Sequence, residues 1–330
     1  MKIIININKG GNEMKKRYLL FILVILSIIS LFIGVHDIKL IDILNYDTEK
    51  MHIFFISRTP RLISILVAGM GMSICGLIMQ QITKNKFVSP TTGATIDAAQ
   101  LGLIFAMLLL PKAGMAGNMI VSFIFALIGT FLFMKILRSL QFKNAVFVPL
   151  VGIMFGNIIG ATTSFIAYKY DLMQNVTAFM QGNFSMIIKG NYEMLYITIP
   201  LIVVAYAYAN KFTIAGMGED FATNLGLNYN KVVNVGLTIV ALVTVCVVIT
   251  VGSIPFIGLI VPNIVSMYKG DNIKDSIWHT GLFGAIFVLV CDLFSRLVIY
   301  PYEIPIGLTV GVIGSIIFLY MILRRNSYAS

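Results

Sequence analysis

Residues Gly216 to Asn228 read GMGEDFATNLGLN, a compact polar stretch that separates two long apolar runs. Glycine residues flank its centre on both sides, and glycine permits the sharp turns that a short connection needs. Glu219 and Asp220 would lie in the first turn of a short helix, where the helix dipole stabilises negative charge. The stretch therefore predicts a short surface helix between two membrane-spanning helices, with an ordinary solvated loop as the alternative.

The apolar runs around this stretch belong to a chain of 330 residues that is 58% hydrophobic and only 12% charged, with a mean hydropathy of +0.92. Several runs reach the length of about 20 residues that a helix needs to cross a bilayer, and they are continuous rather than alternating. This pattern predicts an all-α polytopic membrane protein and argues against a transmembrane β-barrel. The net charge of +10 does not indicate a nucleic-acid partner, because Lys and Arg gather on the cytoplasmic loops of membrane proteins.

Ten apolar segments are expected to be helical: Leu19 to Val35, Leu62 to Ile82, Ala98 to Leu110, Ile120 to Leu137, Ala145 to Ala167, Leu195 to Ala209, Val232 to Val251, Ile254 to Met267, Thr280 to Ile299 and Ile304 to Leu323. The third and the eighth have only 13 and 14 residues, so each alone is short enough to be a re-entrant piece. Both ends of the chain are basic and favour the cytoplasm, which requires an even number of crossings. We therefore predict ten transmembrane helices, with the N-terminal run as the first span and not a signal peptide.

Basic residues set the orientation of these helices. Of the 24 Lys and Arg residues, ten spans place 16 on the inner side and leave eight outside. The eight are Lys39, Lys50, Arg58, Arg61, Lys112, Lys169, Lys189 and Arg296. This distribution puts both chain ends and the stretch from Gly216 to Asn228 in the cytoplasm.

Glycine recurs at every fourth residue in two of the predicted spans. The residues are Gly152, Gly156 and Gly160 in the fifth span, and Gly307 and Gly311 in the tenth. Small residues at this spacing let helix backbones approach closely in lipid. Packing inside one subunit explains them, and so does a subunit interface or the wall of a transport pathway, and the sequence leaves both alternatives open.

Two further segments are expected to be irregular. Pro255 and Pro262 interrupt the eighth apolar segment, which we expect to be kinked or broken. The segment from Tyr168 to Tyr192 is too polar to span a membrane, although its part from Asn175 to Ile188 is mildly amphipathic. We therefore place this segment at the outer surface.

Motifs for enzymatic chemistry are missing from the sequence. It has no G-x-x-x-x-G-K-[ST] loop for ATP, no G-x-S-x-G elbow and no H-E-x-x-H pair. The cysteines and histidines occur singly, without the spacing of a disulfide or metal site: Cys75, Cys246, Cys291, His36, His52 and His279. The sequence thus predicts no catalytic residue, metal or cofactor, and we expect that the chain is not an enzyme.

Charged residues within or beside the predicted spans are few. Asp97 and Asp292 are the acids there, and an intramembrane acid is a functional candidate. Asp292 precedes Arg296 by four residues, within pairing distance on a helix, which favours a structural ion pair. Arg58, Arg61 and Arg296 lie near the outer ends of spans, against the positive-inside bias, and they indicate contact with either lipid headgroups or an acidic partner.

Four stretches in this order resemble a known family. They begin with SRTPRLISILVAGMGMSICGLIMQQITKNKFVSPTTG at Ser57, followed by GEDFATNLGLN, VGSIPFIGLIVPNI and CDLFSRLVIYPYEIPIGLTVGVIGSIIFLYMILRR, which ends at Arg325. Together they resemble the membrane permeases of iron-siderophore, haem and vitamin B12 ABC importers, the FecCD-type family. The resemblance implies the BtuC-like fold of type II ABC importers, with ten spans per subunit and two permease subunits above two ATPase subunits.

The resemblance also implies roles for particular residues. It places coupling to the ATPase on Gly218, Glu219, Asp220, Leu225 and Gly226. It places docking of a substrate-binding protein on Arg58, Arg61 and Arg296, and it assigns the fifth and tenth spans, with their glycines, to the pathway and the dimer axis. Two positions depart from the family pattern: Asn263 stands where a histidine is usual, and Lys86 where a proline is usual.

The sequence is therefore interpreted as a multi-pass permease of the plasma membrane that imports an iron(III)-siderophore, with most similarity to the subgroup for catecholates such as petrobactin. Residues 18–325 form the permease domain, 216–228 its coupling segment, and 1–17 and 326–330 cytoplasmic tails. The implied partners are an ABC ATPase, a binding lipoprotein or periplasmic protein, a second identical or similar permease chain and membrane lipid. The rivals are a proton-coupled transporter that uses Asp97 or Asp292 and a membrane scaffold without transport.

Overall fold

The computed structural model describes the chain except for residues 1–15, 35–47, 93, 113, 140–146 and 327–330. Over the residues that it describes, the chain is helical and has no β-strand, only an isolated bridge between Gln181 and Ser253. The helices in chain order are α1 (Lys16–Phe32), α3 (Thr48–Ile53), η2 (Phe54–Arg58), α4 (Thr59–Ile82), η3 (Pro90–Thr92), α5 (Thr95–Leu109), α6 (Gly114–Ser139), α7 (Phe147–Lys169), α8 (Met173–Met180), η4 (Glu193–Ile197), α9 (Thr198–Ala207), α10 (Ala209–Met217), α11 (Glu219–Asn224), α12 (Tyr229–Val251), α13 (Ile257–Lys269), α14 (Ile273–Leu297) and α15 (Ile306–Asn326).

Each of the ten predicted apolar segments overlaps a helix of the structure. Among the described residues, six helices are long and apolar enough to cross a membrane: Lys50–Ile82, Gly114–Phe133, Leu150–Lys169, Tyr229–Val251, Ile273–Leu297 and Ile306–Leu323. The pair Glu193–Ala207 and Ala209–Met217, bent by 59° at its break, makes a further candidate. The helices α1, α5 and α13 are shorter, with 17, 15 and 13 residues. The all-helical polytopic fold is thus confirmed, while the count of ten spans stays a prediction.

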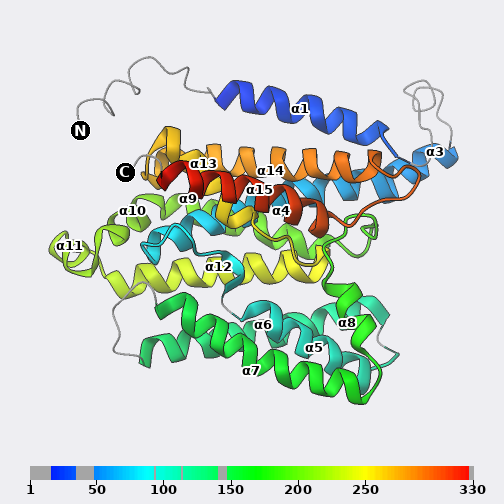
Figure 1. Cartoon of the computed structure of the whole chain (residues 1–330), viewed down its shortest axis with the longest axis horizontal. Helices are drawn as coiled ribbons and strands as arrows, with labels where there is room; N and C mark the ends of the chain where they lie inside the picture. Colours follow the sequence, from blue (N-terminus) through cyan, green and yellow to red (C-terminus); the bar gives the residue numbers. More distant parts are fainter. Residues whose placement is uncertain (1–15, 35–47, 93, 113, 140–146, 327–330) are drawn as a thin grey trace.

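The helix α4 lies at the centre of the molecule, with α12, α13 and α14 packed around it (Figure 1). Its span is 78% buried, more than any other of the six. Glycine makes this close packing possible: a Cβ on Gly76 would come within 1.8 Å of the carbonyl oxygen of Gly258 in α13. Since no side chain fits there, the two backbones can approach only through glycine.

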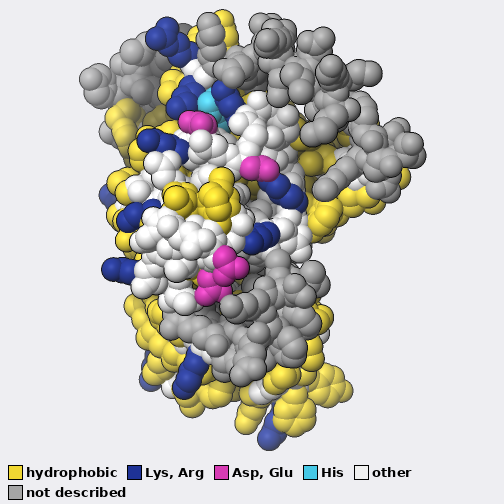
Figure 2. All heavy atoms as spheres, turned by 90° about the vertical axis from the view of Figure 1, so that its left-hand side faces the viewer, with side chains coloured by type: hydrophobic (Ala, Val, Ile, Leu, Met, Phe, Trp, Pro, Cys, Tyr) yellow, Lys and Arg dark blue, Asp and Glu magenta, His cyan; other side chains and the backbone are white. Residues whose placement is uncertain are grey.

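The other helices lie on two sides of this centre. The helices α5, α6 and α7 form a group on the side of α12 away from α14, and α1 lies along α14 at the opposite edge (Figure 1). The start of α1, the helix α11 and the end of α15 share one end of the molecule, whereas α3 and α8 lie at the other end. This placement agrees with an even number of crossings. Figure 2 shows the end that carries α11, where Lys and Arg side chains are spread over the visible face.

The two segments that we expected to be irregular lie against each other. The predicted break falls between α12 and α13, where Pro255 lies outside both helices, while Pro262 is accommodated inside α13. The backbone N–H of Ser253 in this break donates to the carbonyl oxygen of Met180 at 2.9 Å. The chain after α8 therefore fills the end of the molecule opposite α11 and ties the ends of several helices together.

Candidate functional site

The predicted coupling segment forms the short helix that the sequence indicated. Gly218, with a φ of +130°, turns the chain from α10 into α11, which runs from Glu219 to Asn224. The helix stops at Gly226, whose φ is +78°, and the N–H of Leu227 donates to the carbonyl oxygen of Ala222 at 3.0 Å. This bond is the wide one of a Schellman motif, which needs a left-handed residue and favours glycine. The short surface helix is therefore confirmed, with a glycine turn on each side.

One face of α11 presents apolar side chains to the surroundings. Phe221 and Leu225, four residues apart, are 48% and 58% exposed, and Asp220 beside them is exposed as well. Ala222 is fully buried and anchors the opposite face. Two large apolar side chains exposed on one short helix make this face a candidate surface for contact with another protein.

The coupling segment rests on the end of the central helix. A Cβ on Gly216 would come within 2.3 Å of Nε2 of Gln81, and a Cβ on Gly218 within 2.9 Å of Nζ of Lys84. Gln81 belongs to the last turn of α4, and Lys84 follows its C-cap, Thr83. The end of α10 and the turn before α11 therefore pack directly against the end of α4.

The opposite end of α4 carries a cluster of charges. Arg61 donates from Nη2 to Oδ1 of Asp292 at 2.8 Å and from Nη1 to Oε2 of Glu303 at 2.7 Å. Asp292 also pairs with Arg296, which confirms the ion pair predicted from their spacing. The side chains of Arg61, Asp292 and Arg296 are 11%, 1% and 2% exposed, and that of Glu303 is 19% exposed. We call these four residues and Arg58 the outer charge cluster.

Two arginines of the outer charge cluster bind the C-terminal end of α1. Nη1 of Arg296 donates to the carbonyl oxygens of Ser30 and Ile33 at 3.0 Å each, and Arg58 donates to that of Ile33. A cation is favourable at a helix C-terminus, where carbonyl groups lack partners within the helix. Arg58 also lies directly against Gly34, where a Cβ would clash with its guanidinium. The structure thus brings the three predicted docking arginines together; Arg58 and Arg296 hold α1, while Arg61 pairs with Asp292 and Glu303.

The sequence alone did not indicate that Glu303 and the end of α1 contact the predicted docking arginines. Glu303 stands in the stretch YPYEIP, one of few acids in a chain with 14 Asp and Glu residues. It contacts Arg61 across 242 positions of the chain. The rarity of acidic residues was the only signal in the sequence that could have pointed to Glu303, because no local spacing relates it to Arg61.

The glycine-rich faces of the fifth and tenth predicted spans make contacts inside this chain. A Cβ on Gly156 of α7 would come within 2.5 Å of Oδ2 of Asp97 in α5, and one on Gly160 within 3.4 Å of Oδ1. Gly307 of α15 packs near Gly182. Gly152 lies in α7 and is buried, and Gly311 in α15 is partly buried. Packing within the subunit accounts for these contacts, and the predicted role at a dimer interface or pathway stays a prediction.

The two departures from the family pattern touch each other. Nδ2 of Asn263 in α13 donates to the carbonyl oxygen of Lys86 at 2.8 Å. The ammonium group of Lys86 pairs with Asp271, which follows α13. Asn263 therefore fixes the loop after α4 against α13, a task for which its amide is suited because it donates a hydrogen bond at any physiological pH.

A cavity of about 550 Å³ lies between α5, α7 and α8, at the end away from α11. Hydroxyl and amide side chains contribute much of its lining: Gln100, Thr163, Ser164, Thr177, Gln181 and Ser253. Within the described part of the chain, no group of three or more His, Cys, Asp and Glu residues is placed to hold a metal ion. Cys75, Cys246 and Cys291 are buried and free, as expected of packing residues.

Comparisons with known proteins cover almost the whole chain. A model of the FecCD transport family matches residues 22–324. The petrobactin import system permease protein YclN of Bacillus subtilis is 57% identical over 316 residues, which cover 96% of this chain and 100% of that protein. The ferric-anguibactin transport system permease protein FatD of Vibrio anguillarum is 35% identical over 295 residues, or 89% and 94% of the two chains. Among solved structures, an ABC transporter described as of metal-chelate type, in an inward-facing conformation, has a similar fold, with a TM-score of 0.82, 22% identity and coverage of 94% of this chain and 98% of that one.

Proposed function

Because this chain belongs to the FecCD transport family, we propose that it is the membrane permease of an ABC importer that carries an iron(III)-siderophore complex into the cytoplasm. The observation that carries the proposal is the family match over residues 22–324, together with 57% identity to a petrobactin import permease over that protein's full length. The chain is an integral protein of the plasma membrane. Its family consists of transport proteins and not of enzymes, so ATP is hydrolysed by a separate subunit. We propose a siderophore of the catecholate type.

We further propose that the chain crosses the membrane ten times. The six long apolar helices and the bent pair η4–α9 with α10 supply seven of these crossings. The shorter helices α1, α5 and α13 would supply the other three, because each overlaps a predicted span. Support comes from the common end of the molecule at which α1 starts and α15 stops (Figure 1).

The coupling segment is proposed to dock on the ATPase. The support is its exposed face with Phe221 and Leu225 and its direct contact with the end of α4. Gly218 and Gly226 make the turns that lead into and out of the helix, while Glu219 and Asp220 stabilise its N-terminus. When ATP brings the ATPase subunits together, force on α11 would pass to the central helix and change which side of the permease is open.

A second permease chain, identical or similar, is proposed to pack against α7 and α15. Only 22% of each of these two spans is buried, the lowest share among the six. Ile158 in α7 and Val312 in α15 are 67% and 62% exposed. The polar cavity beside α7 is proposed to receive the siderophore complex, whose oxygen-rich surface suits hydroxyl and amide partners.

Docking of a substrate-binding protein at Arg58, Arg61 and Arg296 is also proposed. These arginines already have partners inside the chain, and a docking carboxylate would have to compete with them. Arg61 already holds Glu303, whose side chain is 19% exposed. An incoming carboxylate would therefore compete with Glu303 for the same guanidinium. Arg296 is 2% exposed and would act by holding α1 and Asp292 rather than by direct contact.

Transport driven by ATP is tested with the permease, its ATPase and its binding protein in proteoliposomes. Uptake of the iron-siderophore should require ATP, stop with vanadate and continue after a protonophore dissipates the proton gradient. If the chain is instead a proton-coupled carrier that uses Asp97 or Asp292, the protonophore should abolish uptake and vanadate should leave uptake unchanged. Asp292 is paired with both Arg61 and Arg296, and these two cations favour its charged form, which argues against a role in carrying protons. A scaffold without transport predicts no uptake under any of these conditions.

A further inference from the structure

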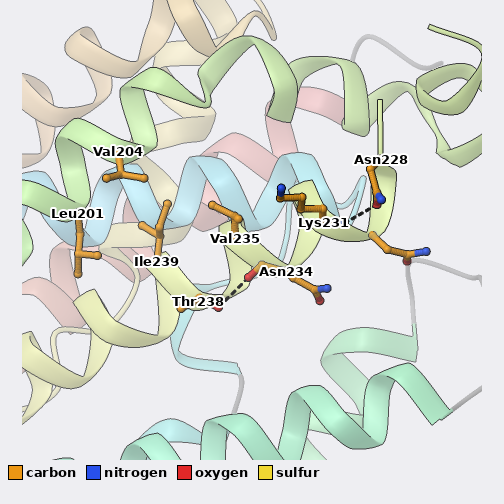
Figure 3. Close-up of a pocket in the computed structure, with 9 residues that line it drawn as sticks. Leu201, Val204, Asn228, Lys231, Asn234, Val235, Thr238 and Ile239 are labelled. Atoms are coloured by element: carbon orange, nitrogen blue, oxygen red, sulfur yellow. Dashed lines mark hydrogen bonds between the residues drawn. The ribbon is translucent and has the colours of Figure 1, made fainter. Parts of the chain in front are cut away.

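A groove with a cavity volume of about 590 Å³ lies between α9 and α12, beside the coupling segment (Figure 3). Helix α12 lines it with two adjacent stripes at a spacing of four residues: Asn230, Asn234 and Thr238, and Lys231, Val235 and Ile239. Helix α9 contributes Leu201 and Val204, and the cap residue Asn228 closes one end. None of these nine residues is acidic.

The groove changes from polar to apolar along its length. In Figure 3 it runs from Asn228 and Lys231 past Asn234 to the end where Ile239 and Leu201 lie. At 1.5 Å per residue, the part of α12 from Asn228 to Ile239 is about 16 Å long, close to half of the ~30 Å hydrocarbon core of a bilayer. The groove therefore has the polarity and depth of one membrane leaflet, with its polar end on the side of α11.

Residues beside the groove indicate that it opens toward lipid. Val203 and Val204 are 61% and 40% exposed, although they belong to an apolar helix that contains no charged residue. Tyr206 and Trp278 are similarly exposed, and their ring centroids lie 5.5 Å apart. Aromatic side chains on a membrane protein gather at the boundary between lipid and water. This pair therefore places the C-terminal end of α9, which leads toward α11, at the inner boundary of the bilayer.

The polar end of the groove is suited to an anion. Lys231 is exposed there, in the first turn of α12, where the N-terminal end of a 23-residue helix adds positive potential. The hydroxyl group of Thr238 already donates a hydrogen bond to the carbonyl oxygen of Asn234 at 2.8 Å. The amide side chain of Asn234, by contrast, is only partly exposed and makes no hydrogen bond to any residue that the structure describes. A partly exposed amide without a protein partner is free to donate to a ligand that brings its own acceptor oxygens.

We propose that this groove binds an anionic phospholipid of the inner leaflet. Lys231 and the amide of Asn234 contact the phosphate and glycerol oxygens, and one acyl chain lies along Val204 and Ile239. The site lies outside the proposed path of the substrate and goes beyond the proposed function. Leu225 of the coupling segment precedes the groove residue Asn228 by three positions, so a bound lipid also steadies the connection between α11 and α12.

Native mass spectrometry tests the charged half of the site. The permease is purified with its ATPase in mild detergent and mixed with equal amounts of phosphatidylglycerol and phosphatidylcholine. Wild type should retain phosphatidylglycerol in preference, and Lys231→Gln should lower its retention about fivefold, the factor of one basic residue at an anionic surface. Lys274→Gln is the matched control, because Lys274 is also exposed behind an asparagine cap, Asn272, but lies outside the groove. Retention by this control should equal that of wild type.

A second pair of variants tests the apolar half independently of charge. Val204→Trp would fill the groove and should reduce retention of phosphatidylglycerol, whereas Val203→Trp, next to it and outside the lining, should not. Equal retention of the two lipids by wild type would overturn the proposal, as would equal losses in Lys231→Gln and Lys274→Gln. Excess glycerol phosphate should leave the bound lipid in place; its displacement would assign the site to a soluble phosphate and refute a lipid site.

Discussion

The two ends of α4 differ in what they offer to a partner. At the outer end, Arg61 is only 11% exposed and is held by Asp292 and Glu303. At the inner end, α11 exposes Phe221 and Leu225, which are 48% and 58% exposed. Charged residues near the outer ends of the spans are thus used inside the molecule, whereas the exposed surface at α11 includes two large apolar side chains.

A charged residue in an unusual position is therefore not by itself evidence of a surface that is free to bind a partner. A buried ion pair is costly to break, because it leaves the remaining charge without compensation. The outer charge cluster therefore acts first as a structural joint between α1, α4, α14 and the segment before α15. At the inner end, Phe221 and Leu225 are exposed, and we propose that this face binds the ATPase.

The largest effect is expected at the joint. Asp292→Ala would leave Arg61 and Arg296 buried beside each other, and the free energy of unfolding should fall by about 3 to 5 kcal/mol. Asp271→Ala is the matched control, because its carboxylate is 64% exposed and pairs with Lys86 at the surface, so its loss should cost about 0 to 1 kcal/mol. Thermal unfolding of both variants in the same detergent measures the difference. Equal stability would contradict the structural role of the outer charge cluster.

A smaller and local effect is expected at the inner end. Gly226→Ala forces a side chain into the left-handed region, at a cost of about 1 to 2 kcal/mol. Gly226→Asn should be milder, because asparagine adopts this conformation more readily. Hydrogen exchange should become faster in α11 of the alanine variant while the midpoint of thermal unfolding stays near that of wild type. Faster exchange throughout α4 and α14 would show instead that α11 is part of the core.

The smallest effect is expected at Glu303, the most exposed of the three residues that pair around Arg61. If a carboxylate of the binding protein competes with Glu303 for Arg61, Glu303→Gln should increase the affinity of the binding protein by about 0 to 1 kcal/mol. The gain should be larger at low salt, since screening weakens exposed charge interactions. Binding in nanodiscs at low and high salt measures it. A lower affinity at low salt would mean that Glu303 supports docking and does not compete with it.

The parts of the structure that the sequence predicted are those set by local patterns. The positions of the long helices follow from continuous apolar runs, and α11 follows from glycines and acids within one short stretch. The Asp292–Arg296 pair followed from a spacing of four residues on one helix. In each case the interacting groups are neighbours along the chain, so helical geometry alone brings them together.

The parts that the sequence could not predict depend on contacts between distant segments. Arg296 meets the carbonyl oxygen of Ser30 across 266 positions, and Arg61 meets Glu303 across 242. Three arginines near the outer ends of spans indicated contact with lipid headgroups or an acidic partner. Tertiary packing also gives them partners inside the chain, and docking of a binding protein stays a prediction. The bend between α9 and α10 and the tie between Ser253 and Met180 likewise leave no periodic signal in the sequence.

The coupling segment exposes apolar side chains that we propose contact the ATPase. Binding of the ATPase to Leu225→Asp tests this role, with Asn224→Asp as the control that adds the same charge beside it without removing an apolar side chain. Leu225→Asp should weaken ATPase binding by about 2 kcal/mol, or roughly 30-fold, as expected of a hot spot. Asn224→Asp should bind like wild type, and both variants should unfold at nearly the wild-type temperature. ATPase binding by Leu225→Asp that equals wild type would contradict the claim.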